Sequence, residues 1–347
     1  MNKSVARRRL TSELLPILLL AAVGLVIPMI FARGIVNEAA VVLIAVVAAL
    51  GLQILTGFAG QLSLGSAALM AVGAFTVGMT NQALPGIPFF VLILWAGVMG
   101  AVVGFLVGLP ALRVRGLYLI VATLALHYIV IFVLQHIQQN GPGVVGYIVS
   151  RPDSLAGDTS WYYLLLAVAL VVTLITAGYK VSATGRAWQM MAHSENAAVA
   201  IGINVRAMKL KAFVLSSFLA GLLGGLLAYT IGVVTYETFP LTLAINYIAA
   251  IIIAGLGSTW ATWLGAAFVI WIPLWVNRLL GTFGDTQNAS LNAQMGVAIF
   301  GVTIILFMMF LPGGLNSLIS NAFARITRSI DRSHERGRVK KGETTDV

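Results

Sequence analysis

The chain has 347 residues, of which 59% are hydrophobic and only 9% are charged, and its formal net charge is +10. A soluble globular domain needs more polar surface than this composition provides, so that class is excluded. The absence of cysteine excludes disulfides, thiolate nucleophiles and cysteine metal sites. Basic residues on cytoplasmic loops are an ordinary topology signal of membrane proteins, so we expect membrane lipid and no nucleic acid as a partner.

The hydrophobic residues gather in repeated runs of about 17–25 residues, which is the length of a membrane-spanning helix. The runs are too continuous for the alternating strands of a barrel. The sequence therefore predicts an all-α, polytopic membrane protein with a single transmembrane domain over residues 1–347. About ten spans are expected, at 14–32, 37–55, 61–80, 89–109, 117–135, 160–179, 212–234, 243–256, 260–276 and 293–311.

The positions of the basic residues predict the orientation of these spans. The first span follows the basic stretch MNKSVARRRL and has no convincing cleavage site, so we expect an uncleaved helix with a cytoplasmic N-terminus. An even number of spans then places both termini in the cytoplasm, including a basic tail over residues 312–347. All lysines and arginines except Arg33, Arg151 and Arg278 fall on the cytoplasmic side, so the predicted topology is self-consistent.

The stretch GFAGQLSLGSAALMAVGAF, residues 57–75, contains small residues every four positions. Ala59, Ser63, Ala67 and Ala71 would line one helical face if this stretch is a helix. Similar stripes occur in two later spans, at Gly100, Gly104 and Gly108 and at Ala220, Gly224, Ala228 and Gly232. Such stripes predict close packing between membrane helices.

Gln61 is the polar exception in this stretch. A buried amide in lipid costs several kcal/mol unless it is paired or hydrated. Gln61 therefore requires a partner helix, a local break near Gly57 and Gly60, or a water-filled path, so it either lines a pathway or bonds between helices. The other candidate pathway-lining residues are Ser63, Ser66, Thr123, His127 and Asn246. For His127, a hydrogen-bonded packing role is the alternative, and the four histidines show no metal-ligand spacing.

The source of energy is expected to lie outside this chain. No carboxylate falls in the middle of a predicted span, where ion-coupled carriers usually place an ionisable group. There is no G-x-x-x-x-G-K-[ST] loop to hold ATP phosphates. No nucleophile–base pair or metal set is visible either, so we expect no catalytic residue, no enzyme activity and no cofactor in this chain.

The predicted cytoplasmic loop 180–211 contains its own helix signals. Ser194 is a good N-cap, Glu195 complements the positive end of a helix dipole, and Gly202 fits a left-handed position after the last turn. These signals predict one short helix over 195–201. Its small residues, with Ala198 facing outward, suit insertion into a groove on a partner protein. A helix lying on the membrane surface is the alternative.

The same loop carries a family resemblance. The pattern E-x-A-A-x-x-x-G, at Glu195, Ala197, Ala198 and Gly202, resembles the loop by which binding-protein-dependent ABC permeases engage their ATPases. The longer stretch GRAWQMMAHSENAAVAIGINVRAMKLKAFVLSSFLAGLLGGLLA, which begins at Gly185 and Arg186, is similar to permeases of branched-chain amino acid importers, particularly those of the M type. The stretches GQLSLGSAALMAVGAFT, RVRGLYLIVATLAL and GLGSTWATWLGAAF resemble other parts of that family.

The resemblance implies a permease subunit in a bacterial inner membrane. Its implied partners are a homologous second permease, two ABC ATPases and a periplasmic binding protein that delivers leucine, isoleucine or valine. Gly185, Arg186, Ser194, Glu195, Ala197, Ala198 and Gly202 would then form an ATPase-coupling loop. Two alternatives remain: a related permease for urea or short-chain amides, and a secondary carrier or facilitative channel.

Overall fold

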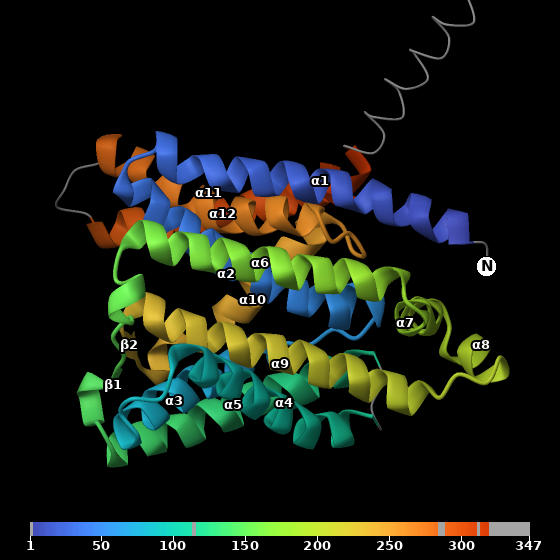
Figure 1. The fold of residues 1–347 in the computed structure, drawn as a ribbon, viewed down its shortest axis with the longest axis horizontal. Helices are drawn as coiled ribbons and strands as arrows, with labels where there is room; N and C mark the ends of the chain where they lie inside the picture. The colour runs from blue at the N-terminus through green and yellow to red at the C-terminus, as the bar shows by residue number, and fades with distance from the viewer. Residues whose placement is uncertain (1–2, 113–115, 284–288, 311–312, 319–347) are drawn as a thin grey trace, which may run out of the picture.

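The computed structural model describes residues 3–112, 116–283, 289–310 and 313–318. The described chain is almost entirely helical, which confirms the predicted all-α class (Figure 1). Arg113, Arg115 and nearly all of the basic tail 312–347 lie outside the described residues. The α-helices are α1 (Lys3–Ile30), α2 (Arg33–Leu52), α3 (Ser66–Ala83), α4 (Phe89–Ala111), α5 (Leu117–Asn140), α6 (Asp158–Val181), α7 (Ala183–His193), α8 (Glu195–Ala200), α9 (Val205–Ile231), α10 (Leu241–Ala254), α11 (Ala261–Phe283) and α12 (Ala289–Phe310).

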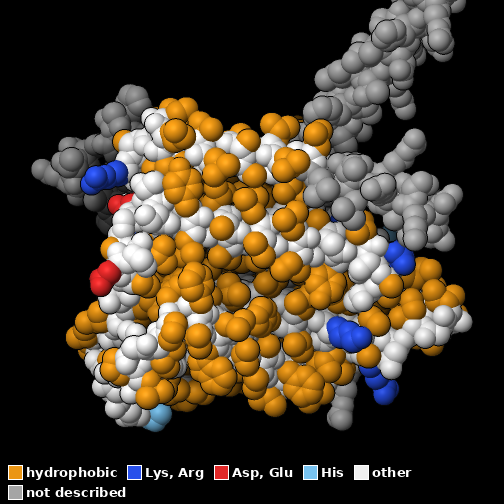
Figure 2. Space-filling view, viewed as in Figure 1, with side chains coloured by type: hydrophobic (Ala, Val, Ile, Leu, Met, Phe, Trp, Pro, Cys, Tyr) orange, Lys and Arg blue, Asp and Glu red, His pale blue; other side chains and the backbone are white. Residues whose placement is uncertain are grey.

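Several of these helices can cross a membrane. In the described part of the chain, six helical segments are long and apolar enough to span: Arg33–Phe58, Phe89–Pro110, Leu117–Asn140, Asp158–Val181, Val205–Ile231 and Tyr236–Ala254. Shorter apolar helical segments cover Leu15–Ile30, Ala261–Val276 and Ala298–Phe307. Figure 2 shows hydrophobic side chains over the middle of the visible face, with charged side chains toward its two ends. The chain is thus a multi-pass membrane protein, while the count of ten spans stays a prediction.

The two ends of the helical bundle differ. One end, here called the α8 end, carries α7, α8 and the start of α1 (Figure 1). The opposite end, called the β end, carries the strands β1 (Tyr147–Ile148) and β2 (Val233–Val234), which pair antiparallel with Tyr147 opposite Val234. Three short 3₁₀ turns, η2 (Gly143–Val145), η3 (Asp153–Leu155) and η4 (Tyr236–Thr238), flank these strands along the chain.

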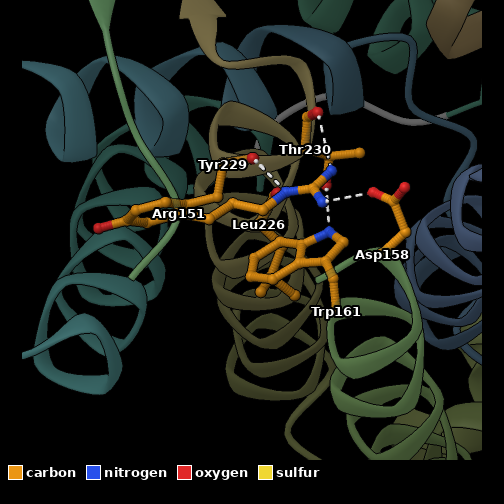
Figure 3. A network of polar contacts seen from close by, with 6 residues as sticks. All are labelled: Arg151, Asp158, Trp161, Leu226, Tyr229 and Thr230. Carbon is orange, nitrogen blue, oxygen red and sulfur yellow. Dashed lines mark hydrogen bonds and ion pairs between the residues drawn. The ribbon is translucent and has the colours of Figure 1, made fainter. Parts of the chain in front are cut away.

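At the β end, Arg151 contacts several segments of the chain (Figure 3). Arg151 donates hydrogen bonds to the carbonyl oxygens of Tyr229 and Thr230, at 3.2 and 3.4 Å. It also pairs with Asp158 at 3.1 Å and lies over the ring of Trp161, 5.0 Å from the ring centroid. These contacts satisfy carbonyls at the C-terminal end of α9 and fasten the segment between α5 and α6 to both α6 and α9.

Gly104 and Gly224 of the predicted small-residue stripes pack closely, as the sequence predicts, whereas Gly232 lies outside its stripe because it follows the end of α9 with φ +84°. A Cβ atom added to Gly224 would lie 1.8 Å from the carbonyl oxygen of Met70 in α3. One added to Gly221 would lie 2.4 Å from that of Ala96 in α4, and one added to Gly104 would lie 2.1 Å from Ser217 Oγ. Helix α9 therefore crosses α3 and α4 at distances that only glycine permits at these positions.

The stripe expected in residues 57–75 is partly wrong, because this stretch is not one helix. A π-helix, η1 (Gln53–Phe58), continues α2, and the irregular segment 59–65 follows before α3 begins at Ser66. Ala59 and Ser63 therefore do not share a helical face with Ala67 and Ala71. Gly60 adopts φ +68°, a conformation that glycine takes without strain. A local break near Gly57 and Gly60, one of the three alternatives given for Gln61, is thus present.

The break packs against a second tight turn, the Gly-Leu-Gly-Ser turn at 255–258. The side-chain amide of Gln53 donates to the carbonyl oxygens of Gly255 and Ser258, at 3.2 and 3.1 Å. Gly255 and Gly257 both have positive φ, at +99° and +85°. The end of α2 therefore supplies a polar partner for buried carbonyls between α10 and α11, as membrane-embedded irregular backbone requires.

Candidate functional site

The loop between α6 and α9 forms the first part of the candidate site. The sequence predicts one short helix here, whereas the structure has two, α7 and α8. Ser182 caps α7, since its hydroxyl accepts a hydrogen bond from the backbone N–H of Gly185 at 3.1 Å. A serine preceding this run is an N-cap signal, so Ser182 could have revealed α7 in the sequence.

Helix α8 has the ends that its sequence predicts. The hydroxyl of Ser194 accepts from the N–H of Ala197 at 3.2 Å. At the other end Gly202 has φ +81°, its N–H donates to Val199 O at 2.9 Å, and the N–H of Ile203 donates to Ala198 O at 3.0 Å. This pair of bonds is a Schellman motif, which ends the helix sharply and satisfies its last carbonyls.

The orientation expected for Ala198 is wrong. Ala198 is fully buried, at 0% exposure, and faces its own chain. The exposed apolar side chains are instead Val199 and Ile201, at 61% and 62%. Glu195 lies one turn before Ala198 on the same face and pairs with Lys209, so this face turns inward.

Lys209 was counted in the sequence only as a topology signal, yet it is the buried centre of this region. Its ammonium group forms an ion pair with Glu195. Its carbonyl oxygen lies 3.4 Å from the side-chain nitrogen of Gln61, and the ring N–H of Trp188 donates to Met208 O at 2.9 Å. Helices α7 and α8 and the segment 59–65 therefore all meet the first turns of α9.

Gly185 and Arg186 shape the turn between α6 and α7. A Cβ atom added to Gly185 would lie 1.9 Å from Tyr179 O, so the backbones pass too closely for any other residue. The guanidinium of Arg186 donates to Val181 O at 2.8 Å while its side chain is exposed. This arrangement fixes the direction in which α7 leaves α6.

Two hollows adjoin α8. A groove of about 1230 Å³ lies beside it, lined by Asn196, Val199 and Arg206 together with Leu109 and Pro110 at the end of α4. A smaller cavity of about 290 Å³ is lined by residues of the segment 59–65, the start of α5, the α7–α8 junction and Lys209. The exposed edge of α8 thus borders a recess large enough for side chains of another protein.

The residues expected to line a pathway fall mostly in one place. Thr123 Oγ1 accepts from the N–H of Leu64 at 3.0 Å, and Ser63 Oγ accepts from the N–H of Gly65 at 3.3 Å. Gln61, Ser63, Ser66, Thr123 and His127 are all buried, in the break and in the part of α5 that faces it. Asn246 is half-buried on a different helix, α10. The break therefore brings together polar residues that are distant in sequence.

Comparisons with known proteins give the family. The family model described as "branched-chain amino acid transport system / permease component" matches residues 34–308. The chain belongs to this family. It is 30% identical over 317 residues to the high-affinity branched-chain amino acid transport system permease protein LivM of Escherichia coli, covering 83% of this chain and 71% of the relative.

Two further relatives bear similar names. The LivM protein of Salmonella typhimurium is 29% identical, with the same two coverages. A probable branched-chain amino acid transport permease protein LivM of Methanocaldococcus jannaschii is 23% identical over 71% of this chain and 73% of its own length. No solved structure matches the chain. The region shared with this permease family includes the break, α7, α8 and Lys209.

Proposed function

We propose that this permease is the transmembrane subunit of an ATP-driven importer, and that α8 is the element that a separate ATPase moves. The observation that carries the proposal is the form of α8. It is a short helix capped at both ends, anchored through Glu195 and Lys209, with Val199 and Ile201 exposed beside a groove. A capped and anchored helix transmits displacement, whereas a loose loop would absorb it.

In this proposal the α8 end is cytoplasmic, both termini lie on that side, and the chain spans a bacterial inner membrane about ten times. A homologous second permease completes the passage, two ATPases bind at the α8 end, and a binding protein delivers substrate at the β end. The names of the relatives support a branched-chain amino acid such as leucine as the substrate.

The proposed route of coupling follows the contacts of Lys209. ATPase closure displaces α8, and the Glu195–Lys209 pair passes the displacement to the first turns of α9. The contact between Gln61 and Lys209 O passes it on to the broken segment 59–65. Because α9 packs closely on α3 and α4, its movement changes the position of helices across the bundle. Substrate then passes by alternating access.

The test is co-purification of the ATPases with tagged permease in which Val199 is replaced by aspartate. A charge on the exposed apolar edge of α8 should weaken ATPase retention by about tenfold or more, as loss of a central apolar contact does at interfaces. Val144→Asp is the matched control, since Val144 is a 96% exposed valine at the opposite end. Equal ATPase retention by Val199→Asp and Val144→Asp would contradict the proposal.

A further inference from the structure

Helix α3 begins among buried polar side chains to which the coupling route gives no role of their own. Helix α3 has 18 residues and begins at Ser66, directly after the irregular segment. Ser66 is only 4% exposed and His127, on α5, only 2%. Within the described structure Ser66 Oγ and His127 Nδ1 have no hydrogen-bond partner. Buried polar atoms are nearly always bonded, and of the five buried side-chain atoms without a hydrogen bond in the described structure these two lie on α3 and α5, which pack together.

Ser66 and His127 lie on segments whose neighbouring residues contact each other. Leu64 N–H donates to Thr123 Oγ1 at 3.0 Å. A Cβ atom added to Gly65 would lie 3.3 Å from Leu126 Cδ2 and 3.4 Å from Thr123 O. Ser66 follows Gly65 at the start of α3, and His127 lies one turn beyond Thr123 on the same face of α5. The face of α5 that carries His127 therefore lies against the start of α3.

This place lies inside the apolar part of the bundle. His127 is ten residues beyond Leu117, the first residue of α5, and thus about 15 Å along the axis of a 24-residue helix. Irregular backbone at such depth is tolerated where it is buried in protein or lines a cavity. Broken membrane helices whose N-termini face the midplane are typical of sites for anionic substrate groups.

We infer that Ser66, His127 and the N-terminus of α3 bind the carboxylate of the transported amino acid during its passage. The inference rests on the proposed function and names the substrate-contacting point within it. The donors are a hydroxyl, one imidazole N–H and the positive end of a helix dipole. This set binds a carboxylate without a full positive charge, so release remains easy, as transport requires.

The site is closed in this structure and opens when α5 separates from α3. Helix α5 packs mainly on α3 and has smaller contacts with α4 and with the turns η2 and η4. It is therefore less firmly held than α9, which packs along both α3 and α4. Movement of the segment 59–65, driven through Gln61 and Lys209, would uncover Ser66 and His127 together.

A unique thiol tests the site directly, because the chain has no cysteine. The Ser66→Cys variant is assembled into the full complex in detergent. The complex is treated with a small anionic thiosulfonate, with and without ATP, and labelling of this chain is measured by mass spectrometry. Millimolar leucine should slow labelling about fivefold or more, and leucinamide, which lacks the carboxylate, should not. The matched control is Ser217→Cys, at a buried serine whose hydroxyl already donates to Phe213 O at 2.7 Å. Labelling of that thiol should not respond to leucine.

Uptake by the same complex, reconstituted with loaded binding protein, gives a second readout. His127→Leu and Ser66→Ala should lower the maximal rate by about tenfold, the loss typical of one hydrogen bond to a charged group. His127→Asn should restore most of the rate, because its amide nitrogen can occupy the place of Nδ1, and Ser217→Ala should leave the rate unchanged.

The outcomes separate this inference from the proposed function. Normal ATP-driven uptake by Ser66→Ala and His127→Leu, or Ser66→Cys labelling that leucine leaves unchanged, would overturn the carboxylate site while the importer proposal stands. Uptake that needs no ATP, together with leucine protection of Ser66→Cys, would overturn the importer proposal and leave the site in place. A thiol that no condition labels would also overturn the site, because the passage would never reach it.

Discussion

At the scale of single residues, Lys209 of α9 contacts two other segments, one through its charge and one through its backbone. Its ammonium group pairs with Glu195 of α8, and its carbonyl oxygen faces the amide of Gln61. A buried ion pair contributes little net stability, but removing one partner leaves the other charge without compensation. The main effect of the ion pair is therefore to fix the orientation of α8 on α9.

Replacing Lys209 by methionine tests this role. Methionine fills a similar volume without charge, so the ion pair with Glu195 is lost and α8 loses about 2 kcal/mol of local anchoring, between the values for buried and exposed pairs. We expect ATP-driven uptake to fall by about thirtyfold, while the chain still reaches the membrane. Lys211→Met is the control, since Lys211 is an exposed lysine of the same helix. Unchanged uptake in Lys209→Met would remove Lys209 from the coupling route.

The residue scale also shows what sequence alone can find. Ser63, Ser66, Thr123 and His127 stood out because polar residues are rare within apolar runs, and the structure brings them to one break. The role of Lys209 could not be found in this way. Its partner Glu195 lies across a turn closed by Gly202, and no helical spacing relates the two positions.

At the scale of elements, α8 was predictable because its signals are local. A capping serine and a left-handed glycine define a helix from neighbouring residues alone. The direction that Ala198 faces was not predictable, because it depends on the distant partner of Glu195. In the region of the span expected at 61–80, helix α3 begins only at Ser66, since the π-helix η1 and Gly60 interrupt the helix before it.

Gly202→Val tests whether the sharp end of α8 matters. A Cβ atom at Gly202 would meet nothing within 4 Å, so the change acts only through the strain of placing valine at φ +81°. That strain is about 1–3 kcal/mol, and it should unwind the last turn of α8 rather than unfold the membrane helices. We expect normal membrane insertion, weakened ATPase binding and loss of ATP-driven uptake.

Gly178→Val is the matched control for this variant. Gly178 lies within α6 and has no positive φ, and a Cβ atom added there would also meet nothing within 4 Å. Pull-down of the ATPases and uptake of radiolabelled substrate should therefore match the unmodified protein. Full recovery of both activities in Gly202→Val would mean that α8 is only a connection.

At the scale of the whole molecule, a cytoplasmic ATPase can reach α8 only if the α8 end faces the cytoplasm. The described basic residues Lys180, Arg186, Arg206, Lys209 and Lys211 lie in or next to α7 and the start of α9 at the α8 end. A reporter inserted near Glu195 should read cytoplasmic, and one near Asp153 should read external. An external reading near Glu195 would place α8 out of reach of any cytoplasmic ATPase.

Transport by the assembled complex in vesicles tests whether the permease belongs to an ATP-driven importer. This chain, a homologous second permease and the two ATPases are reconstituted, and uptake of radiolabelled leucine is measured with binding protein outside and ATP inside. We expect uptake that requires both ATP and binding protein and that Gly202→Val abolishes. Uptake driven by a sodium or proton gradient in the absence of ATP would contradict this expectation and identify a secondary carrier.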